Sequence, residues 1–324
     1  MPSSEEAHMI QGTDCVCVGL TILDILGRHI DSIPQGNKTS IIEQIRTTPA
    51  GTAAGPAVIA AKLGLKTTLV GAIGTDDMGD YLLGMLKKQG VDTAYMQRRA
   101  ELPTAATMLA VNSKGDRPNF HAIGATILLE IDDKTREHIV HSRFVHWGGV
   151  GTMLNLDGGA GADILKQANS NGAVVTCDFI APGPQTLDAL KLVLPHVKYF
   201  MPSMDEAAEI AGTVTPEDTA KFYLDLGPEA CIFKWGAKGS LLATRSGLTR
   251  IPAFSVAVVD TTGCGDSYCA GFIAGLARGF DLEKACRFGT AVSALVATGL
   301  GSDAGVQGFD ETVKAMETLP VLDA

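Results

Sequence analysis

The sequence lacks the cysteine and histidine patterns of disulfide-linked and zinc-binding proteins. Its seven cysteines are an odd number and include no CxxC pair, so neither a disulfide framework nor a zinc site is indicated. The seven histidines form no HExxH arrangement, which argues against a metalloprotease. A reducing compartment is therefore the expected setting.

Targeting and membrane segments are missing as well. Residues 1–9 are acidic and polar, whereas a signal peptide would be basic and then apolar. No apolar run is long and continuous enough to cross a bilayer. We therefore expect a cytoplasmic protein without a membrane partner.

Basic charge is scarce. The chain has 26 Lys and Arg against 36 Asp and Glu, which gives a formal net charge of −10. The pairs at 87–88 and 98–99 are isolated, and a nucleic-acid interface would need a basic stripe with aromatic neighbours. Nucleic acid is therefore excluded as a partner, but a phosphate-bearing cofactor is not, because backbone dipoles at a helix N-terminus bind anions.

What the sequence does have is a regular alternation of strand-like and helix-like segments. This alternation predicts an α/β fold with a mostly parallel sheet, whose ligands bind at the carboxyl ends of the strands. The expected strands cover residues 14–20, 67–71, 173–177, 197–201 and 230–234, and the expected helices include 53–63, 78–89, 160–168 and 205–211.

Two stretches break this alternation. Residues 27–49 contain no convincing helix, and residues 104–121 are β-rich around a turn at 112–115. We expect the two stretches to pair into a small sheet beside the main one. The core would then comprise residues 1–26, 50–103 and 122–324, with 27–49 and 104–121 inserted as a β lid.

The most informative segment is DTTGCGD at residues 260–266, directly before a helix-like run that stops at Gly279. Gly263 and Gly265 would leave backbone N–H groups open to a ligand at the helix N-terminus, which suits a transferring phosphoryl group. Asp266 lies where one group must orient or deprotonate the nucleophile. For GxGD alone, a simple turn with Asp266 as helix cap would be the preferred interpretation.

The full string closely resembles the signature of the PfkB (ribokinase-like) carbohydrate kinases, usually DTxGAGD, with Cys264 in place of the common Ala. Other segments resemble family elements in the right order. They are residues 19–24 (the opening strand), 50–64 (the N-terminal signature), 70–79 (vGxxGxDxxG) and 235–239 (the GxxG turn near the nucleotide). The resemblance implies a three-layer α/β/α core with a small β-sheet lid.

The resemblance also implies roles for individual residues. Asp266 would be the general base, and the N–H groups of Gly263, Cys264 and Gly265 would stabilise the γ-phosphoryl charge. The other implied positions are Asp24, Gly51 and Gly55 for substrate, Gly236, Lys238 and Gly239 for ATP, Glu206 for Mg²⁺ through water, and Asp260 and Thr262 for a monovalent cation, usually potassium.

Three positions depart from the family pattern. Ser203 stands where relatives have the Asn of NxxE, although Glu206 is retained. Gly55, followed by Pro56, replaces a substrate-contacting Asn, and residues 178–180 are Asp-Phe-Ile where many sugar kinases have Asp-Pro-Asn. The usual sugar readout is therefore expected to be altered.

Together these features indicate an ATP-dependent kinase that phosphorylates a primary hydroxyl of a small sugar or sugar-like molecule. An unphosphorylated acceptor is favoured because residues 50–57 contain no Lys or Arg to meet a second phosphate. A nucleoside kinase acting on a ribose 5′-hydroxyl, and a non-catalytic sugar- or nucleotide-binding regulator, remain alternatives. A homodimer through the lid would be in keeping with the resemblance.

Overall fold

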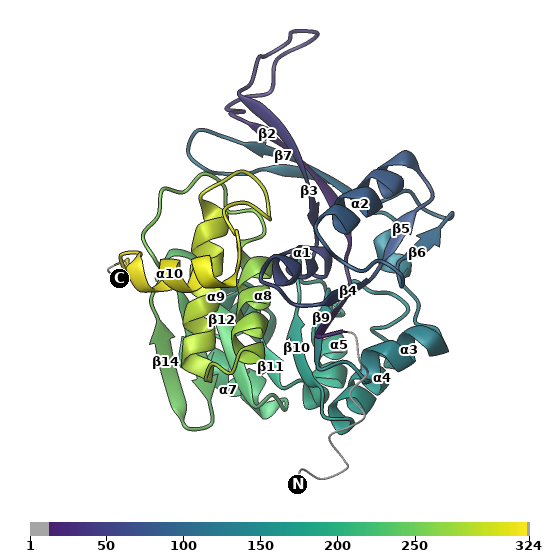
Figure 1. Ribbon diagram of the computed structural model, residues 1–324, viewed down its shortest axis with the longest axis vertical. Helices are drawn as coiled ribbons and strands as arrows, with labels where there is room; N and C mark the ends of the chain where they lie inside the picture. The colour runs from purple at the N-terminus through teal and green to yellow at the C-terminus, as the bar shows by residue number, and fades with distance from the viewer. Residues whose placement is uncertain (1–12, 323–324) are drawn as a thin grey trace.

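The computed structural model describes residues 13–322, and it is built around one large sheet (Figure 1). The acidic segment 1–9 lies outside the described residues. The eight strands have the order β14-β13-β12-β11-β10-β9-β1-β4 and are parallel, except that β13 is antiparallel to both of its neighbours. Their bounds are β1 Cys15–Val18, β4 Thr67–Val70, β9 Phe144–Gly148, β10 Val174–Asp178, β11 Tyr199–Phe200, β12 Ala230–Lys234, β13 Ser240–Thr244 and β14 Gly247–Ile251.

Helices cover both faces of this sheet, which is why its central strands consist almost entirely of buried residues. One layer contains α8 and α9, which pack on each other, with α1 against α8 and α10 against α9; the other layer runs from α3 to α7. The helices are α1 Ala54–Lys62, α2 Asp77–Lys88, α3 Asp133–Val140, α4 Ala160–Ser170, α5 Thr186–Val193, α6 Met204–Ala211, α7 Pro216–Asp225, α8 Cys264–Ala277, α9 Leu282–Ala297 and α10 Phe309–Thr318.

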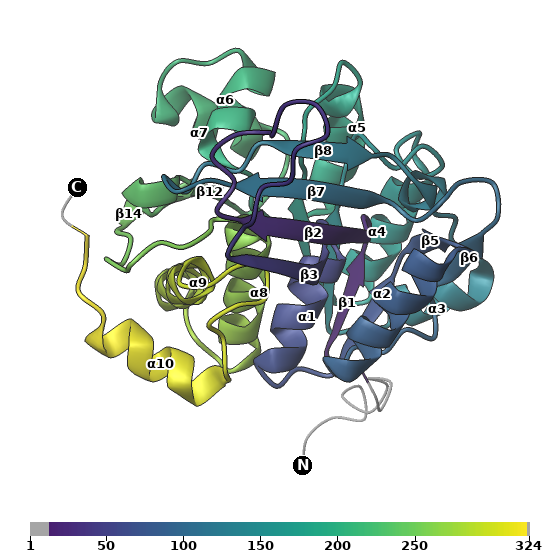
Figure 2. The same cartoon turned by 90° about the horizontal axis from the view of Figure 1, so that it is seen from above.

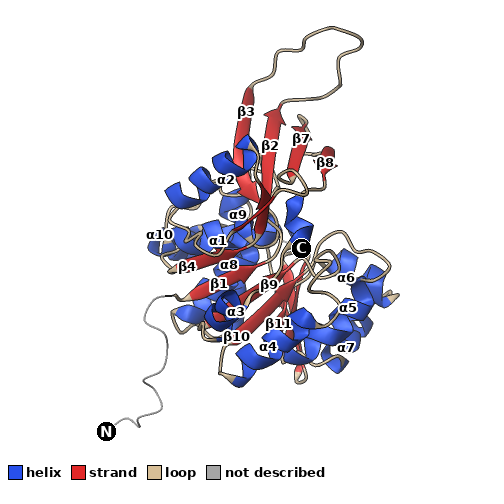
Figure 3. Ribbon diagram, turned by 90° about the vertical axis from the view of Figure 1, so that its right-hand side faces the viewer, coloured by secondary structure: helices blue, strands red, loops and turns tan. Residues whose placement is uncertain are grey.

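A second sheet of four strands projects from the core, as Figure 3 shows, with the order β3-β2-β7-β8. We call it the lid sheet. Seen from above in Figure 2, its strands run across the top of α1 and α8. Its strands are β2 Ile22–Arg28, β3 Gln44–Ala50, β7 Ala106–Val111 and β8 Asn119–Ala122, and a further pair, β5 Ala72–Gly74 with β6 Gln97–Arg99, lies beside it.

The three-layer core and the small second sheet confirm the expected fold class, with one difference in the lid. The lid sheet includes residues 22–26, which we expected in the core, so Asp24 lies within β2 and not at the end of the opening strand. The cause is Gly19, where φ is +140° and an added Cβ would lie 2.1 Å from the carbonyl oxygen of Gly148. The chain turns there, ends β1 at Val18 and starts a new strand.

No helix within residues 13–322 is both long and apolar enough to span a membrane.

Candidate active site

The loop that opens α8 has a fixed shape. Gly263 precedes the helix with φ of +71°, and a Cβ on it would lie 2.3 Å from the Cβ of Ser302, so only glycine fits. The buried carboxylate of Asp260 accepts hydrogen bonds from the backbone N–H and the hydroxyl of Thr262, at 2.9 and 2.7 Å. Its other oxygen accepts from the N–H of Gly301 at 2.8 Å. Asp260 therefore ties this loop to the segment after α9.

Two backbone N–H groups at the start of α8 are weakly paired or unpaired. The N–H of Cys264 donates to the carbonyl of Thr261 at 3.3 Å, a long hydrogen bond. Within residues 13–322, the N–H of Gly265 has no acceptor in the protein. Unpaired N–H groups in the first turn, together with the helix dipole, form a site for an anion.

The side chain of Cys264 points away from this site. Its Sγ lies 3.5 Å from the carbonyl oxygen of Ser293 on α9, and burial raises the pKa of the thiol to about 12. A neutral thiol turned toward a neighbouring helix is no nucleophile. The Cys264 side chain is therefore directed toward α9.

Asp266 is the third residue of α8, and α1 packs directly behind it. A Cβ added to Gly55 would lie 3.0 Å from Oδ2 and 3.1 Å from Cβ of Asp266. Gly55 is thus the position that lets α1 approach the carboxylate. The sequence suggested that Gly55 removes a substrate contact, and in the structure its direct neighbour is the expected base.

The pKa of Asp266 is raised to about 7. The largest cause is burial, followed by the negative charges of Asp178 and Asp24, while Lys234 and Arg117 act in the opposite direction. The residue is nevertheless only half-buried. A carboxyl group whose pKa lies near neutrality can take up and release a proton at the working pH, which is the property of a general base.

The lid sheet supplies a polar row on the side of Asp24. Asp24 on β2 lies opposite Thr107 on β7, and Thr107 lies opposite His121 on β8. Thr107 Oγ1 is 3.1 Å from His121 Nδ1. Burial raises the pKa of Asp24 to about 6, although a hydrogen bond from Thr107 opposes this shift. From the turn between β7 and β8, Arg117 donates its Nε–H to Thr261 Oγ1 at 3.1 Å, so the lid reaches the α8 loop.

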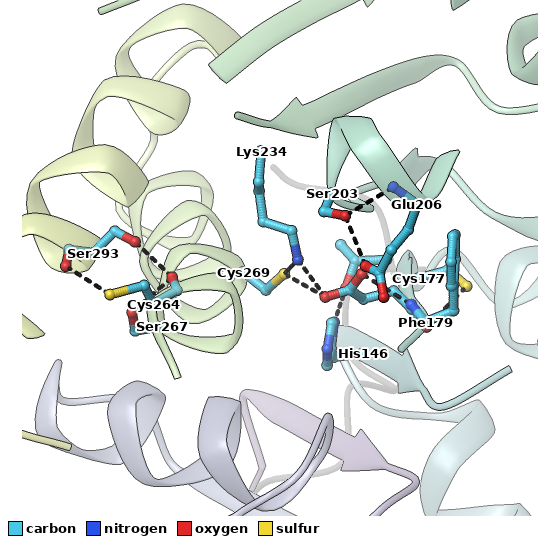
Figure 4. A network of polar contacts seen from close by, with 12 residues as sticks. His146, Cys177, Phe179, Ser203, Glu206, Lys234, Cys264, Ser267, Cys269 and Ser293 are labelled. Atoms are coloured by element: carbon cyan, nitrogen blue, oxygen red, sulfur yellow. Dashed lines mark hydrogen bonds and ion pairs between the residues drawn. The ribbon is translucent and has the colours of Figure 1, made fainter. Parts of the chain in front are cut away.

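Behind the loop lies an ion pair that sequence reasoning missed. Lys234 ends β12 and donates to Oδ2 of Asp178, which ends β10 and is 3% exposed. Figure 4 shows Lys234 beside Cys269, whose Sγ is 3.7 Å from Nζ and 3.5 Å from Asp178 Oδ2. Burial alone would lower the pKa of Lys234, but Asp178 reverses the effect and raises it. The available signal was that Lys234 ends one predicted strand and Asp178 directly follows another, where ligands of parallel sheets bind.

Glu206 lies in the first turn of α6. Its Oε2 accepts from the hydroxyl of Ser203 at 2.7 Å, and Oε1 accepts from the N–H of Ala181 at 3.1 Å. Ser203 Oγ also accepts from the N–H of Glu206 at 3.3 Å, which makes Ser203 the N-cap of α6. Ser203, which replaces the expected Asn, therefore has a structural role that orients Glu206 (Figure 4).

The turn after β12 carries the positions expected near ATP. Gly236 and Lys238 are exposed, and the Lys238 ammonium lies 4.5 Å above the ring of Trp235. Gly239 has φ of +84°, and a Cβ there would lie 2.0 Å from the carbonyl oxygen of Ile251. Gly51, with φ of +95°, similarly allows the close approach of β3 to Leu20. Both glycines are required by the backbone before any ligand is considered.

Comparison with known proteins is consistent with this geometry. Residues 12–307 match the model of the pfkB family carbohydrate kinases. The ATP-dependent 6-phosphofructokinase of Thermoanaerobacterium thermosaccharolyticum is 27% identical over 84% of this chain and 85% of its own length. The nucleoside kinase of Methanothermobacter thermautotrophicus is 25% identical over 94% of this chain and 96% of its own length.

Solved structures share the fold. Arabidopsis thaliana ribokinase, complexed with ribose and ATP, superposes with a TM-score of 0.79 at 24% identity, over 95% of this chain and 99% of that chain. An E. coli protein assigned as ribokinase II, in complex with ATP and Mg²⁺, gives 0.81 at 23% identity, over 94% and 99%. Since the family model covers most of the chain, the protein belongs to the pfkB family of carbohydrate kinases and is a phosphotransferase with an alcohol group as acceptor.

Proposed function

We propose that the protein transfers the γ-phosphoryl group of ATP to a primary hydroxyl of a small sugar or sugar-like molecule, with Asp266 as general base. The observation that carries this proposal is the position of Asp266. It follows the unpaired N–H of Gly265 in the first turn of α8 and has a pKa of about 7. A base and an anion site one residue apart are what an in-line attack by a hydroxyl requires.

In the proposed reaction Asp266 accepts the proton of the acceptor hydroxyl as the oxygen attacks the γ-phosphorus. The bond from this phosphorus to the β-γ bridging oxygen breaks, and ADP leaves. The N–H of Gly265, with those of Gly263 and Cys264, stabilises the charge on the transferring group. Asp24 orients the acceptor through its hydroxyls, and Gly236, Lys238 and Gly239 border ATP.

Mg²⁺ is part of the proposal. In the described part of the chain, no three His, Cys, Asp or Glu side chains are grouped to hold a metal, so ATP phosphates and water would supply most ligands. Glu206 fits the role of ordering one such water, because Ser203 and Ala181 fix its carboxylate and leave lone pairs free. When bound, Mg²⁺ neutralises charge on the β- and γ-phosphates.

We further propose a monovalent cation, most simply potassium, near Asp260 and Thr262. Asp260 is 1% exposed, and no Lys, Arg or His among residues 13–322 forms an ion pair with it. A buried carboxylate held only by hydrogen bonds suits a bound cation. Turnover in potassium, compared with tetramethylammonium at equal ionic strength, should be higher; equal rates would refute the cation.

The acceptor is proposed to be unphosphorylated. The lid arginines already have partners: Arg46 on β3 pairs with Asp303 at 2.7 Å, Arg28 on β2 lies 3.9 Å from Glu43, and Arg117 donates to Thr261 Oγ1 at 3.1 Å. A sugar compared with its monophosphate tests this choice. Higher kcat/KM for the phosphorylated form would overturn this choice. It would favour a phosphorylated acceptor and a reaction like that of the 6-phosphofructokinase relative.

A nucleoside kinase acting on a ribose 5′-hydroxyl is the second candidate. It is favoured by the match to a nucleoside kinase over almost the full length of both chains. Comparing adenosine and inosine with ribose, fructose and ketodeoxygluconate separates the two candidates.

Since all seven cysteines are free thiols, a reducing, cytoplasmic setting is retained in the proposal.

A second copy of the chain is proposed to pack on the outer face of the lid sheet. Met108 and Phe120 are cross-strand neighbours on β7 and β8 and are 57% and 59% exposed, and Ile45 on β3 is 69% exposed. Such an apolar face is unusual for a monomer. Light scattering should report a dimer that Phe120→Glu converts to a monomer, and a monomeric wild type would refute it.

A further inference from the structure

The ion pair of Asp178 and Lys234 lies beside the proposed base without a role in the reaction described so far. The two residues end strands β10 and β12, which β11 separates. Lys234 Nζ donates to Asp178 Oδ2, and the Cys269 thiol donates to the same oxygen at 3.5 Å. The side chains of Asp178 and Lys234 are only 4% and 12% exposed. Such a pair needs a reason, because burying two charges is costly.

The ammonium of Lys234 also lies against the α8 loop. A Cβ added to Gly265 would be 3.3 Å from Nζ, and Gly265 directly precedes Asp266. Lys234 is therefore close to the carboxylates of both Asp178 and Asp266, and it donates its hydrogen bond to Asp178. If the Lys234 ammonium paired with Asp266 instead, its N–H groups would occupy the carboxylate oxygen of Asp266. That oxygen must take the proton of the acceptor hydroxyl.

We propose that Asp178 is a positioning residue for the transfer reaction: it holds the Lys234 ammonium away from Asp266 and so keeps the Asp266 carboxylate free for the acceptor hydroxyl. The inference rests on the proposed function of Asp266 as base. It assigns a purpose to Asp178, which the sequence analysis named only as the first residue of the altered segment 178–180.

The charges around Asp266 make the proposal testable. The groups that face it are Asp178 from β10, Lys234 from β12, Asp24 from the lid sheet and Arg117 from the β7–β8 turn. Cys269 on α8 is a neutral thiol, because burial raises its pKa well above the usual value. From α1, Gly55 approaches it. In the wild type, the charges of Asp178 and Lys234 shift the pKa of Asp266 in opposite directions.

Each single substitution unbalances this pair in a different direction. Asp178→Asn leaves a positive charge that is free to pair with Asp266, and Lys234→Met leaves a negative charge beside it. The double variant Asp178→Asn/Lys234→Met removes both charges and restores the balance. Replacing a whole buried pair is also far better tolerated than removing one partner.

The experiment is a ¹³C NMR titration of aspartate-labelled full-length protein, with the Asp266 carboxyl signal assigned by its loss in Asp266→Asn. We expect its pKa to be about one to two pH units lower in Asp178→Asn, higher by a similar amount in Lys234→Met, and close to wild type in the double variant. Asp225→Asn, which breaks the exposed Lys221–Asp225 pair of 2.9 Å on α7, is the matched control and should shift nothing.

Kinetics supply the second readout. At pH 7, kcat of Asp178→Asn should fall about tenfold or more, and the double variant should recover to within about threefold of wild type. Shifts of the same sign in both single variants, or wild-type kcat in Asp178→Asn, would overturn the proposal. If Asp178→Asn does not fold, Lys234→Met and the double variant still decide, since an unchanged Asp266 pKa in Lys234→Met contradicts it.

Failure of the proposed function is a separate result. A wild type that phosphorylates none of the acceptors would refute the kinase reaction at these acceptors, while the NMR shifts would still report whether Asp178 controls Lys234. If the wild type is active but the Asp266 pKa does not shift in opposite directions in Asp178→Asn and Lys234→Met, only the role of Asp178 is refuted.

Discussion

Replacing Gly55 by alanine should slow catalysis without weakening the fold. The new methyl group would lie 3.0 Å from Oδ2 and 3.1 Å from Cβ of Asp266, tighter than ordinary van der Waals contact, so the carboxylate must move by a few tenths of an ångström. Since a displacement of ~1 Å at a reacting group costs on the order of 100-fold, we expect kcat to fall about tenfold. Gly55 is the second residue of α1, and alanine is favoured over glycine in a helix by at most about 0.5–1 kcal/mol, which offsets part of the strain.

The matched control is Gly84→Ala. Gly84 lies on the exposed side of α2, and an added Cβ there meets no atom within 4 Å. This variant should gain about 0.5–1 kcal/mol in the free energy of unfolding and keep wild-type kcat. The assays are urea unfolding and coupled detection of ADP release. Wild-type kcat in Gly55→Ala would refute the close approach of α1 to the base.

Two predictions follow from the raised pKa of Asp266, and a third follows from the direction of the Cys264 side chain. The acid limb of kcat/KM against pH should have its midpoint near 7, because only the carboxylate accepts a proton; a limb near pH 4 would exclude Asp266 as base. Because the folded state keeps this proton up to about pH 7 and the unfolded chain releases it near pH 4, stability falls across that window as pH rises. Thermal unfolding at pH 8 should therefore find Asp266→Asn more stable by on the order of 1 kcal/mol or more; equal or lower stability would contradict it. Cys264→Ala should keep kcat within about twofold, since only its N–H is used, and a large loss of kcat would assign the thiol a role.

The parts of the site that are local in sequence could be predicted from it. The loop from Asp260 to Asp266 sets its own geometry through a left-handed glycine and an aspartate that caps the turn two residues on. The alternation of strands and helices likewise predicted the layered core, because each segment shows its own periodicity. These features need no knowledge of distant contacts.

The contacts between distant segments could not be predicted. Lys234 was recognised as the end of a strand, but its partner Asp178 lies 56 residues earlier and meets it only because both strands end at the same edge of the sheet. Gly55 was interpreted as part of the substrate pocket, and its contact with Asp266 could not be foreseen because Asp266 is on a helix far along the chain. Asp24 was expected at the end of the first strand, and the turn at Gly19 moved it into the lid sheet.

The central claim is that Asp266 is the base of an ATP-dependent kinase, and the most direct test is ADP formation by wild type and Asp266→Asn. The acceptors are adenosine, inosine, ribose, fructose and ketodeoxygluconate, each with Mg²⁺. We expect turnover with at least one acceptor in the wild type, and loss of about 100-fold or more in Asp266→Asn with ATP binding retained. Turnover that survives Asp266→Asn unchanged would contradict the account.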